Sequence, residues 1–215
     1  MPDPTQLALF FAAALVLAIT PGPGLFYVAA RTLAGGRAEG VASSLGTGLG
    51  GTVHVLAGSL GVSAVVLASA ELFTALKLAG AAYLVWVGLR TLRAARRDAA
   101  AALRGVASPP VGARRAFREG VLVEALNPKT AAFFLAFVPQ FVVADAAPVA
   151  LQFVVLGFVS VALNTLADIA VAFAAGNLRD GAAARPRLIR RLREASGAAM
   201  IALGLGLALA RRPAG

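Results

Sequence analysis

Polar side chains that could do chemistry interrupt two apolar stretches in the second half of this chain. Glu124, Asn127 and Lys129 stand close together in one stretch. Asn164 and Asp168 are four positions apart in the next, so a helix would place them on one face. An ionised side chain at the centre of a bilayer costs about 3 kcal/mol or more, and such residues usually mark a substrate or proton pathway. We therefore take these residues as candidates for binding and coupling.

The tripeptide Asn127-Pro128-Lys129 combines a helix break with a positive charge. Pro128 frees the carbonyl of Glu124, four residues earlier, from its helical partner. The helix that begins after the break would point backbone N–H groups into it, which favours an anion such as a substrate carboxylate. Lys129 would add a full positive charge at the same point. The alternative is that Lys129 only pairs with Glu124 or Asp168 and so holds the fold together.

Three titratable side chains could carry a coupling proton, namely His54, Glu124 and Asp168. Asp168 could instead accept a substrate ammonium group or act as the charge partner of Lys129. His54 ends the glycine-rich stretch 50–54, and an imidazole can exchange protons at physiological pH. The alternative for His54 is a structural hydrogen bond to a neighbouring carbonyl.

A second break occurs in the first half of the chain, at Thr20-Pro21-Gly22-Pro23-Gly24. Proline and glycine at this density cannot continue an α-helix, yet the flanking residues are apolar. Irregular backbone at membrane depth is tolerated only where it is buried in protein or lines a wet cavity. Paired interruptions in corresponding halves of a membrane protein indicate a transport site. The residues predicted to bind substrate or to gate are Thr20, Pro21, Gly22, Pro23, Gly24, Asn127, Pro128, Lys129, Asn164 and Asp168.

Apolar segments of membrane-spanning length make up most of the chain and must position these residues. The sequence has 215 residues, of which 59% are hydrophobic and 14% charged, with a mean hydropathy of +0.81. A bilayer core requires about 20 consecutive apolar residues per helix. We predict an all-α integral membrane protein with six transmembrane helices, of which the first and fourth are broken. The expected ranges are 6–30, 41–68, 71–92, 117–143, 148–175 and 195–210.

Basic residues gather in three of the predicted loops. The net charge is +10, and the clusters lie at residues 31–37, 90–118 and 179–193. Cytoplasmic loops of membrane proteins carry an excess of Lys and Arg of this kind. The pattern therefore favours a protein in a lipid bilayer over one that binds nucleic acid. It also predicts that both termini lie outside the cytoplasm.

Three helices on each side of the central loop suggest two repeats. We expect residues 1–92 to form the first repeat, 93–116 a basic cytoplasmic linker, and 117–215 the second repeat. The stretch Ala18–Gly22 aligns with Ala125–Lys129, which pairs the two breaks. An odd number of helices makes the second repeat enter the membrane upside down, which is the inverted plan of many secondary transporters.

The residue types that metal centres and hydrolases need are scarce. The chain has no cysteine and one histidine, which excludes thiolate and His-rich metal sites. It also lacks the Gly-x-Ser-x-Gly turn of a membrane hydrolase. We expect a transporter with no metal, no cofactor and no enzymatic activity. A divalent-cation exporter of a related fold and an intramembrane enzyme are the alternatives.

At these motifs the sequence resembles the lysine-exporter (LysE/RhtB) family of bacterial amino-acid exporters, over nearly the whole chain from about Leu7. The resemblance implies a secondary transporter in the bacterial inner membrane. It implies export of an amino acid or a close derivative by alternating access, in exchange for protons. The glycine-rich second segment makes a homodimer plausible. The resemblance rests on Ile19–Gly24, Gly48–His54, Lys77–Leu84, Phe117–Gly120, Asn127–Lys129, Phe133-Phe134 and Pro139–Phe141.

The predicted topology can be tested with single cysteines, because the native chain has none. Cysteines replacing Ala100 and Ala183 should react with a membrane-impermeant thiol reagent only from the cytoplasmic side. A cysteine replacing Ala146 should react only from the outside. Labelling of positions 100 and 146 from the same side of the membrane would rule out the inverted six-helix arrangement.

Overall fold

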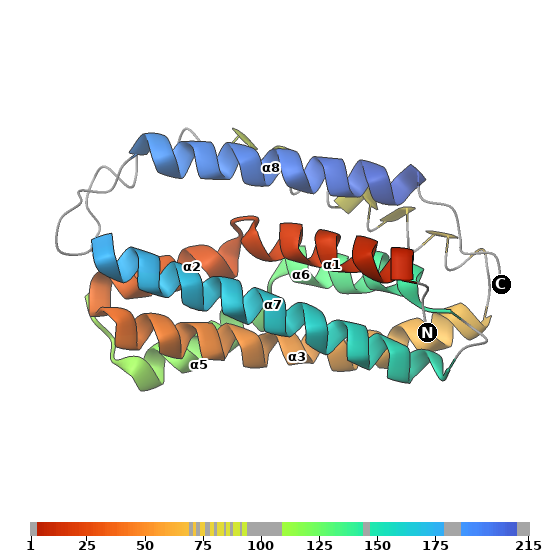
Figure 1. Ribbon diagram of the computed structural model, residues 1–215, viewed down its shortest axis with the longest axis horizontal. Helices are drawn as coiled ribbons and strands as arrows, with labels where there is room; N and C mark the ends of the chain where they lie inside the picture. Colours follow the sequence, from red (N-terminus) through yellow and green to blue (C-terminus); the bar gives the residue numbers. More distant parts are fainter. Residues whose placement is uncertain are drawn as a thin grey trace.

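The computed structural model describes residues 4–68, 109–143, 147–178 and 186–209, together with scattered positions between 71 and 93. Within these ranges the chain is helical and contains no strand, which confirms the predicted all-α class. Figure 1 shows the helices lying lengthwise beside one another, with α8 (Pro186–Leu209) next to α1 and outside the main group. Parts of the third predicted segment, most of the linker, and residues 144–146, 179–185 and 210–215 lie outside the described residues.

The first predicted span is a bent pair of helices, α1 (Pro4–Ile19) and α2 (Pro23–Gly35), which meet at 45°. The bend falls at the predicted break. Pro21 and Pro23 have no N–H to continue the hydrogen-bond ladder, and Gly22 between them is extended, with φ −133°. Pro23 then begins α2, where a missing N–H costs nothing because the first helical N–H groups have no internal partner.

The second bent pair begins with α5 (Ala113–Ala125) and resumes, at 41°, with α6 (Pro128–Ala132). The sequence predicts a helix from this break to residue 143, and the chain is helical to Phe141, although it is not α-helical throughout. After α6 the winding changes to a π-helix, η1 (Phe133–Phe137), and then to a 3₁₀ turn, η2 (Val138–Phe141). Pro139 explains the change, because it can neither donate to the carbonyl four residues earlier nor pack against it in an α-helix.

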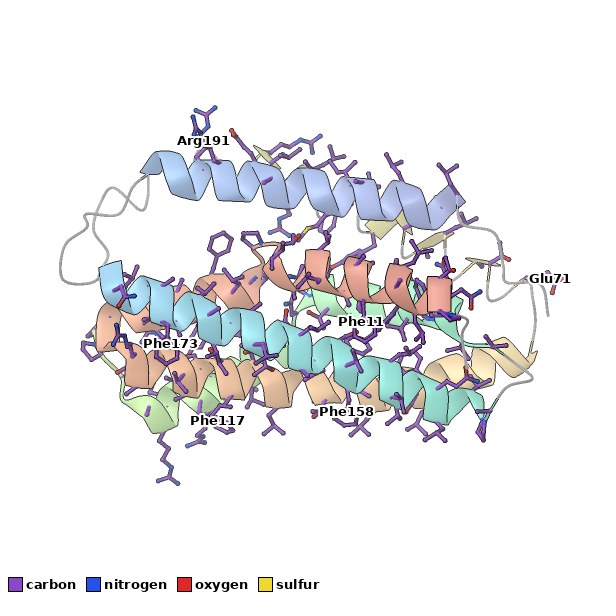
Figure 2. The ribbon with its side chains drawn as sticks, viewed as in Figure 1. Phe11, Glu71, Phe117, Phe158, Phe173 and Arg191 are labelled. Atoms are coloured by element: carbon purple, nitrogen blue, oxygen red, sulfur yellow. The ribbon has the colours of Figure 1, made fainter. Side chains whose placement is uncertain are left out.

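Two long helices, α3 (Arg37–Ala68) and α7 (Val149–Leu178), pack against these bent pairs. Among the described residues α7 by itself is long and apolar enough to cross a bilayer, and the count rises to three if each bent pair is one span. The arrangement of six spans in two inverted repeats stays a prediction. Large apolar side chains cover the outside of the bundle, among them Phe11, Phe158 and Phe173 in Figure 2. An apolar exterior of this kind suits contact with lipid.

Helices extend further into the basic loops than the sequence predicts. α2 runs on past residue 31, and Gly36 alone separates it from α3, with a φ of 83° that favours glycine. α5 begins at residue 113 rather than 117, and α8 at residue 186 rather than 195. Ion pairs one turn apart stabilise these two helices near their starts. The pairs are Arg115–Glu119 and Arg190–Glu194, each with a 2.7 Å contact between nitrogen and oxygen.

The end of the linker is fixed to helices of the first half. The Oε1 atom of buried Glu39 accepts hydrogen bonds from the N–H groups of Val111 (2.8 Å) and Gly112 (2.7 Å). The hydroxyl of Tyr27 donates to the carbonyl of Ala116 at 2.9 Å. The described end of the predicted linker is therefore an ordered part of the bundle.

Glycines bring α3 and α5 into backbone contact. A Cβ added to Gly46 would lie 2.1 Å from the carbonyl oxygen of Phe117, and one added to Gly50 would lie 2.4 Å from that of Val121. Small residues permit this close approach of helices in a membrane protein. The packing holds α5, and with it the second break, against α3.

This packing predicts opposite effects for two glycine-to-alanine substitutions in α3. Gly46→Ala should lower the free energy of unfolding by about 2 kcal/mol, because the added methyl group forces two backbones apart. Gly61→Ala is the matched control, since nothing lies within 4 Å of its added Cβ. It should be neutral or stabilise by up to about 1 kcal/mol through helix propensity. The apparent Tm of both purified variants in detergent measures the difference, and equal Tm values would contradict the contact.

Candidate functional site

Lys129 connects the two helix breaks. It follows Pro128 at the start of α6, and its ammonium group donates hydrogen bonds to the carbonyl oxygens of Leu17 (3.1 Å) and Thr20 (2.9 Å) at the end of α1. The usual partner of the Leu17 carbonyl, four residues later, is Pro21, which has no N–H, and the N–H of Thr20 reaches this carbonyl instead at 3.2 Å, beside the ammonium group. The negative end of the α1 dipole favours a cation at the same place.

The surroundings of Lys129 are tight and exclude solvent. The side chain is 4% exposed. A Cβ on Gly22 would come within 3.1 Å of Lys129 Nζ, so glycine leaves the space that the ammonium group occupies. Among the described residues no carboxylate oxygen lies within 4.0 Å of this nitrogen. The direct ion pair with Glu124 or Asp168 that the sequence left open is thus not formed here.

A capping network holds the second break. The Oδ1 atom of Asn127 accepts from the N–H of Lys129 at 3.0 Å, which makes Asn127 the N-cap of α6. Its Nδ2 donates to Glu124 Oε2 at 2.9 Å, and the hydroxyl of Thr130 donates to Glu124 Oε1 at 2.6 Å. Both oxygens of the buried Glu124 carboxylate are therefore held in place. Thr130 was not among the predicted residues.

His54 makes the structural hydrogen bond that was its alternative role. Its Nε2 lies 2.8 Å from the carbonyl oxygen of Glu124, which fixes the proton on Nε2 if the ring is neutral. This is the carbonyl that Pro128 deprives of its helical N–H, so the sequence argument about the proline agrees with the contact. The ring also stacks on Phe134, with centroids 6.0 Å apart.

Asp168 is buried on α7 with one oxygen engaged. Its Oδ2 accepts a hydrogen bond from the hydroxyl of Thr47 on α3 at 2.7 Å. Its Oδ1 is buried and has no hydrogen-bond partner among the described residues. Asp168 is close enough to Glu124 and Lys129 to interact with both electrostatically. Two carboxyl groups and one ammonium group thus lie near one another inside the bundle.

A small, partly open cavity lies beside this network. Of the predicted residues, Glu124 and Asn164 line the cavity. The other predicted residues are not among those that line it. The sequence reasoning missed most of the lining. The sequence did contain a signal for this lining. Thr47, Gly48 and Gly51 on α3 are hydroxyl or small residues spaced three or four apart, so they share one face of the helix, and Ser160 lies four positions before Asn164 on α7. The lining consists of Leu17, Thr47, Gly48, Gly51, Glu124, Thr130, Phe133, Phe134, Ser160, Val161 and Asn164.

Comparison with known proteins gives consistent matches along the chain. The family model of the LysE type translocator matches residues 15–211. An uncharacterized membrane protein of Vibrio cholerae is 30% identical over 92% of this chain and 94% of its own length. A homoserine/homoserine lactone efflux protein of Salmonella typhimurium is 30% identical over 91% of this chain and 92% of its own. A threonine efflux protein of Salmonella typhi is 30% identical over 96% and 100%, respectively.

No solved structure matches the chain. The family model nevertheless covers both helix breaks, the residues that line the cavity and all of α8. The match of nearly the full length also agrees with the apolar helices of the structure. This membrane protein belongs to the LysE translocator family.

Proposed function

We propose that the protein exports an amino acid or a close derivative, which binds in the cavity beside the two breaks. The observation that carries this proposal is the contact of Lys129 with the end of α1, next to a cavity that contains the Glu124 carboxylate. It joins the two interrupted helices at one point, which is where secondary transporters of this plan bind their substrates. The printed names of two relatives, which describe homoserine and threonine efflux, support this class of substrate.

Alternating access would use the interruptions as hinges. Residues 20–24 and the π-helical and 3₁₀ segments after Ala132 lack a regular α-helical ladder, so they can change their dihedral angles at lower cost. In this proposal Lys129 gates the movement, because its two hydrogen bonds to α1 hold the halves of the site together. The central loop 93–116 would lie in the cytoplasm, with the protein in the inner membrane.

Proton coupling would use Asp168. Its Oδ1 is buried without a partner, and an oxygen in that state can take up a proton without breaking a hydrogen bond. One ammonium group lies in the same region as two carboxyl groups, so protonation of one carboxyl leaves one positive and one negative charge. Glu124 is the weaker candidate, since both its oxygens already accept hydrogen bonds. His54 is weaker too, because its Nε2 is used at the break.

Lys129→Met should abolish transport and reduce stability. The substitution removes the two hydrogen bonds that the ammonium group donates to the buried carbonyls of Leu17 and Thr20, which costs about 2 kcal/mol in the free energy of unfolding. Arg115→Met is the control, since this guanidinium is on the surface and its loss should change the apparent Tm little. The double variant Lys129→Met with Asp168→Asn should stay inactive. Recovered transport in the double variant would mean that Lys129 only neutralises Asp168.

An efflux assay tests both the substrate class and the coupling. Proteoliposomes with the purified protein are loaded with single labelled amino acids from a panel, homoserine and threonine included, and efflux is followed with and without an imposed pH gradient. The native protein should export at least one of them against its gradient. Asp168→Asn should lose this uphill export and keep exchange down a gradient.

The control for this assay is Glu194→Gln, which removes a partly exposed carboxylate from α8 and should export normally. If no amino acid leaves the vesicles faster than from empty liposomes, the proposed substrate class is wrong. If Asp168→Asn pumps uphill at the native rate, the substrate class stands and the coupling role of Asp168 falls.

A further inference from the structure

We propose that the cavity recognises the ammonium end of its substrate, at Glu124, and does not require a free carboxylate. This inference rests on the proposed function and specifies its substrate class. The protein would accept primary amines whose carboxyl group is masked as an amide, an ester or a lactone at least as well as the free amino acid.

The charge of the cavity lining is the first observation. Of the described residues that line it, Glu124 is the one with a charged side chain, and the others are apolar or carry a hydroxyl or an amide. A zwitterion that enters this space meets a partner for its ammonium group. Its carboxylate meets no cation in the lining. Loss of water from this carboxylate and its repulsion by Glu124 both make the binding free energy less favourable.

The position of Lys129 is the second observation, because this lysine was the expected partner of a carboxylate. Its ammonium group already donates to two carbonyl oxygens, those of Leu17 and Thr20, and it does not line the cavity. The side chain fits against Gly22 with contacts of 3.1 Å. Turning it toward the cavity would break both of these charged hydrogen bonds. Lys129 therefore serves the backbone of the first break.

The third observation is the preparation of Glu124 for a cation. Thr130 and Asn127 each donate one hydrogen bond to the carboxylate, to different oxygens. An ionised carboxylate has about four acceptor positions, so room for further donors remains. The two bonds fix the carboxylate before the substrate arrives, which lowers the entropy cost of binding.

The aromatic and hydroxyl residues around Glu124 fit the same ligand. Phe133 and Phe134 line the cavity with rings at 84° to each other and centroids 5.7 Å apart. Ring faces attract an organic cation and have no such attraction for an anion. Ser160 and Asn164 on α7 offer oxygen acceptors for the remaining N–H bonds of an ammonium group.

Protection of a single cysteine in the cavity tests the inference without measuring transport. The reporter is Val161→Cys in the otherwise cysteine-free chain, with Leu17→Cys as a second reporter in case the first does not fold. The rate of reaction with N-ethylmaleimide is measured on purified protein in proteoliposomes. The probes are L-homoserine, L-homoserine lactone, and the analogues of both in which a hydroxyl replaces the amino group. L-threonine, its amide and their deaminated analogues form a parallel set.

We expect the amines to slow the reaction, with the lactone and the amide effective at concentrations no higher than the free amino acids. The deaminated analogues should not protect. Glu124→Gln should raise the protecting concentration about tenfold or more, because a charged hydrogen bond is lost. Glu119→Gln is the matched control on the same helix, since Glu119 pairs with Arg115 on the surface and does not line the cavity. A cysteine at exposed Arg114 should not be protected by any probe.

Three results would overturn the inference: protection by the deaminated acids, protection by the free amino acids without protection by the lactone or amide, or no protection by any amine. The second would leave the proposed export of amino acids intact. Conversely, protection by the amines without efflux of any amino acid from proteoliposomes would support the binding mode and disprove the export function.

Discussion

The site depends on one constraint, which is that every backbone carbonyl freed by a proline inside the bundle must find another donor. Pro21 removes the N–H that would serve Leu17, and Pro128 removes the one that would serve Glu124. The first carbonyl accepts from the N–H of Thr20 and from the ammonium group of Lys129. The second accepts from the N–H of Asn127, and the ring nitrogen of His54 lies 2.8 Å from it. Each break is therefore held by a local backbone hydrogen bond and by a side chain from another segment, and the side chains bring the two bent pairs and α3 together.

One of the side chains that bond the backbone at the breaks also fixes a residue of the cavity lining. Asn127 caps α6 and at the same time fixes the Glu124 carboxylate, which lines the cavity. The close approach of α3 to α5 at Gly50 places His54 within reach of the second break. Stability and binding are thus coupled here, so movement of the breaks during transport would have to exchange these hydrogen bonds for others.

Local chemistry made much of the fold predictable. The breaks at residues 20–24 and 127–129 follow from the dihedral limits of proline and glycine, which act wherever the segment lies. The all-α class follows from long apolar segments. The predicted boundaries failed where local interactions extend a helix into a polar loop, as at the start of α8, and where Pro139 imposes a tighter winding on part of an apolar run. Charge and hydropathy report where a segment is polar, and polar segments can still be helical.

The sequence by itself determined which residues break helices, which helices are apolar, and which buried charges need partners. It could not determine the partners. Helical spacing shows that Asn164 and Asp168 share a face of α7, yet Asn164 lines the cavity and Asp168 bonds Thr47. Lys129 could have met either carboxylate, and it reaches carbonyls of α1 instead. Only the tertiary structure decides this, because a side chain bonds whatever the neighbouring helix presents at its depth, and that depends on the packing of segments far apart in the chain.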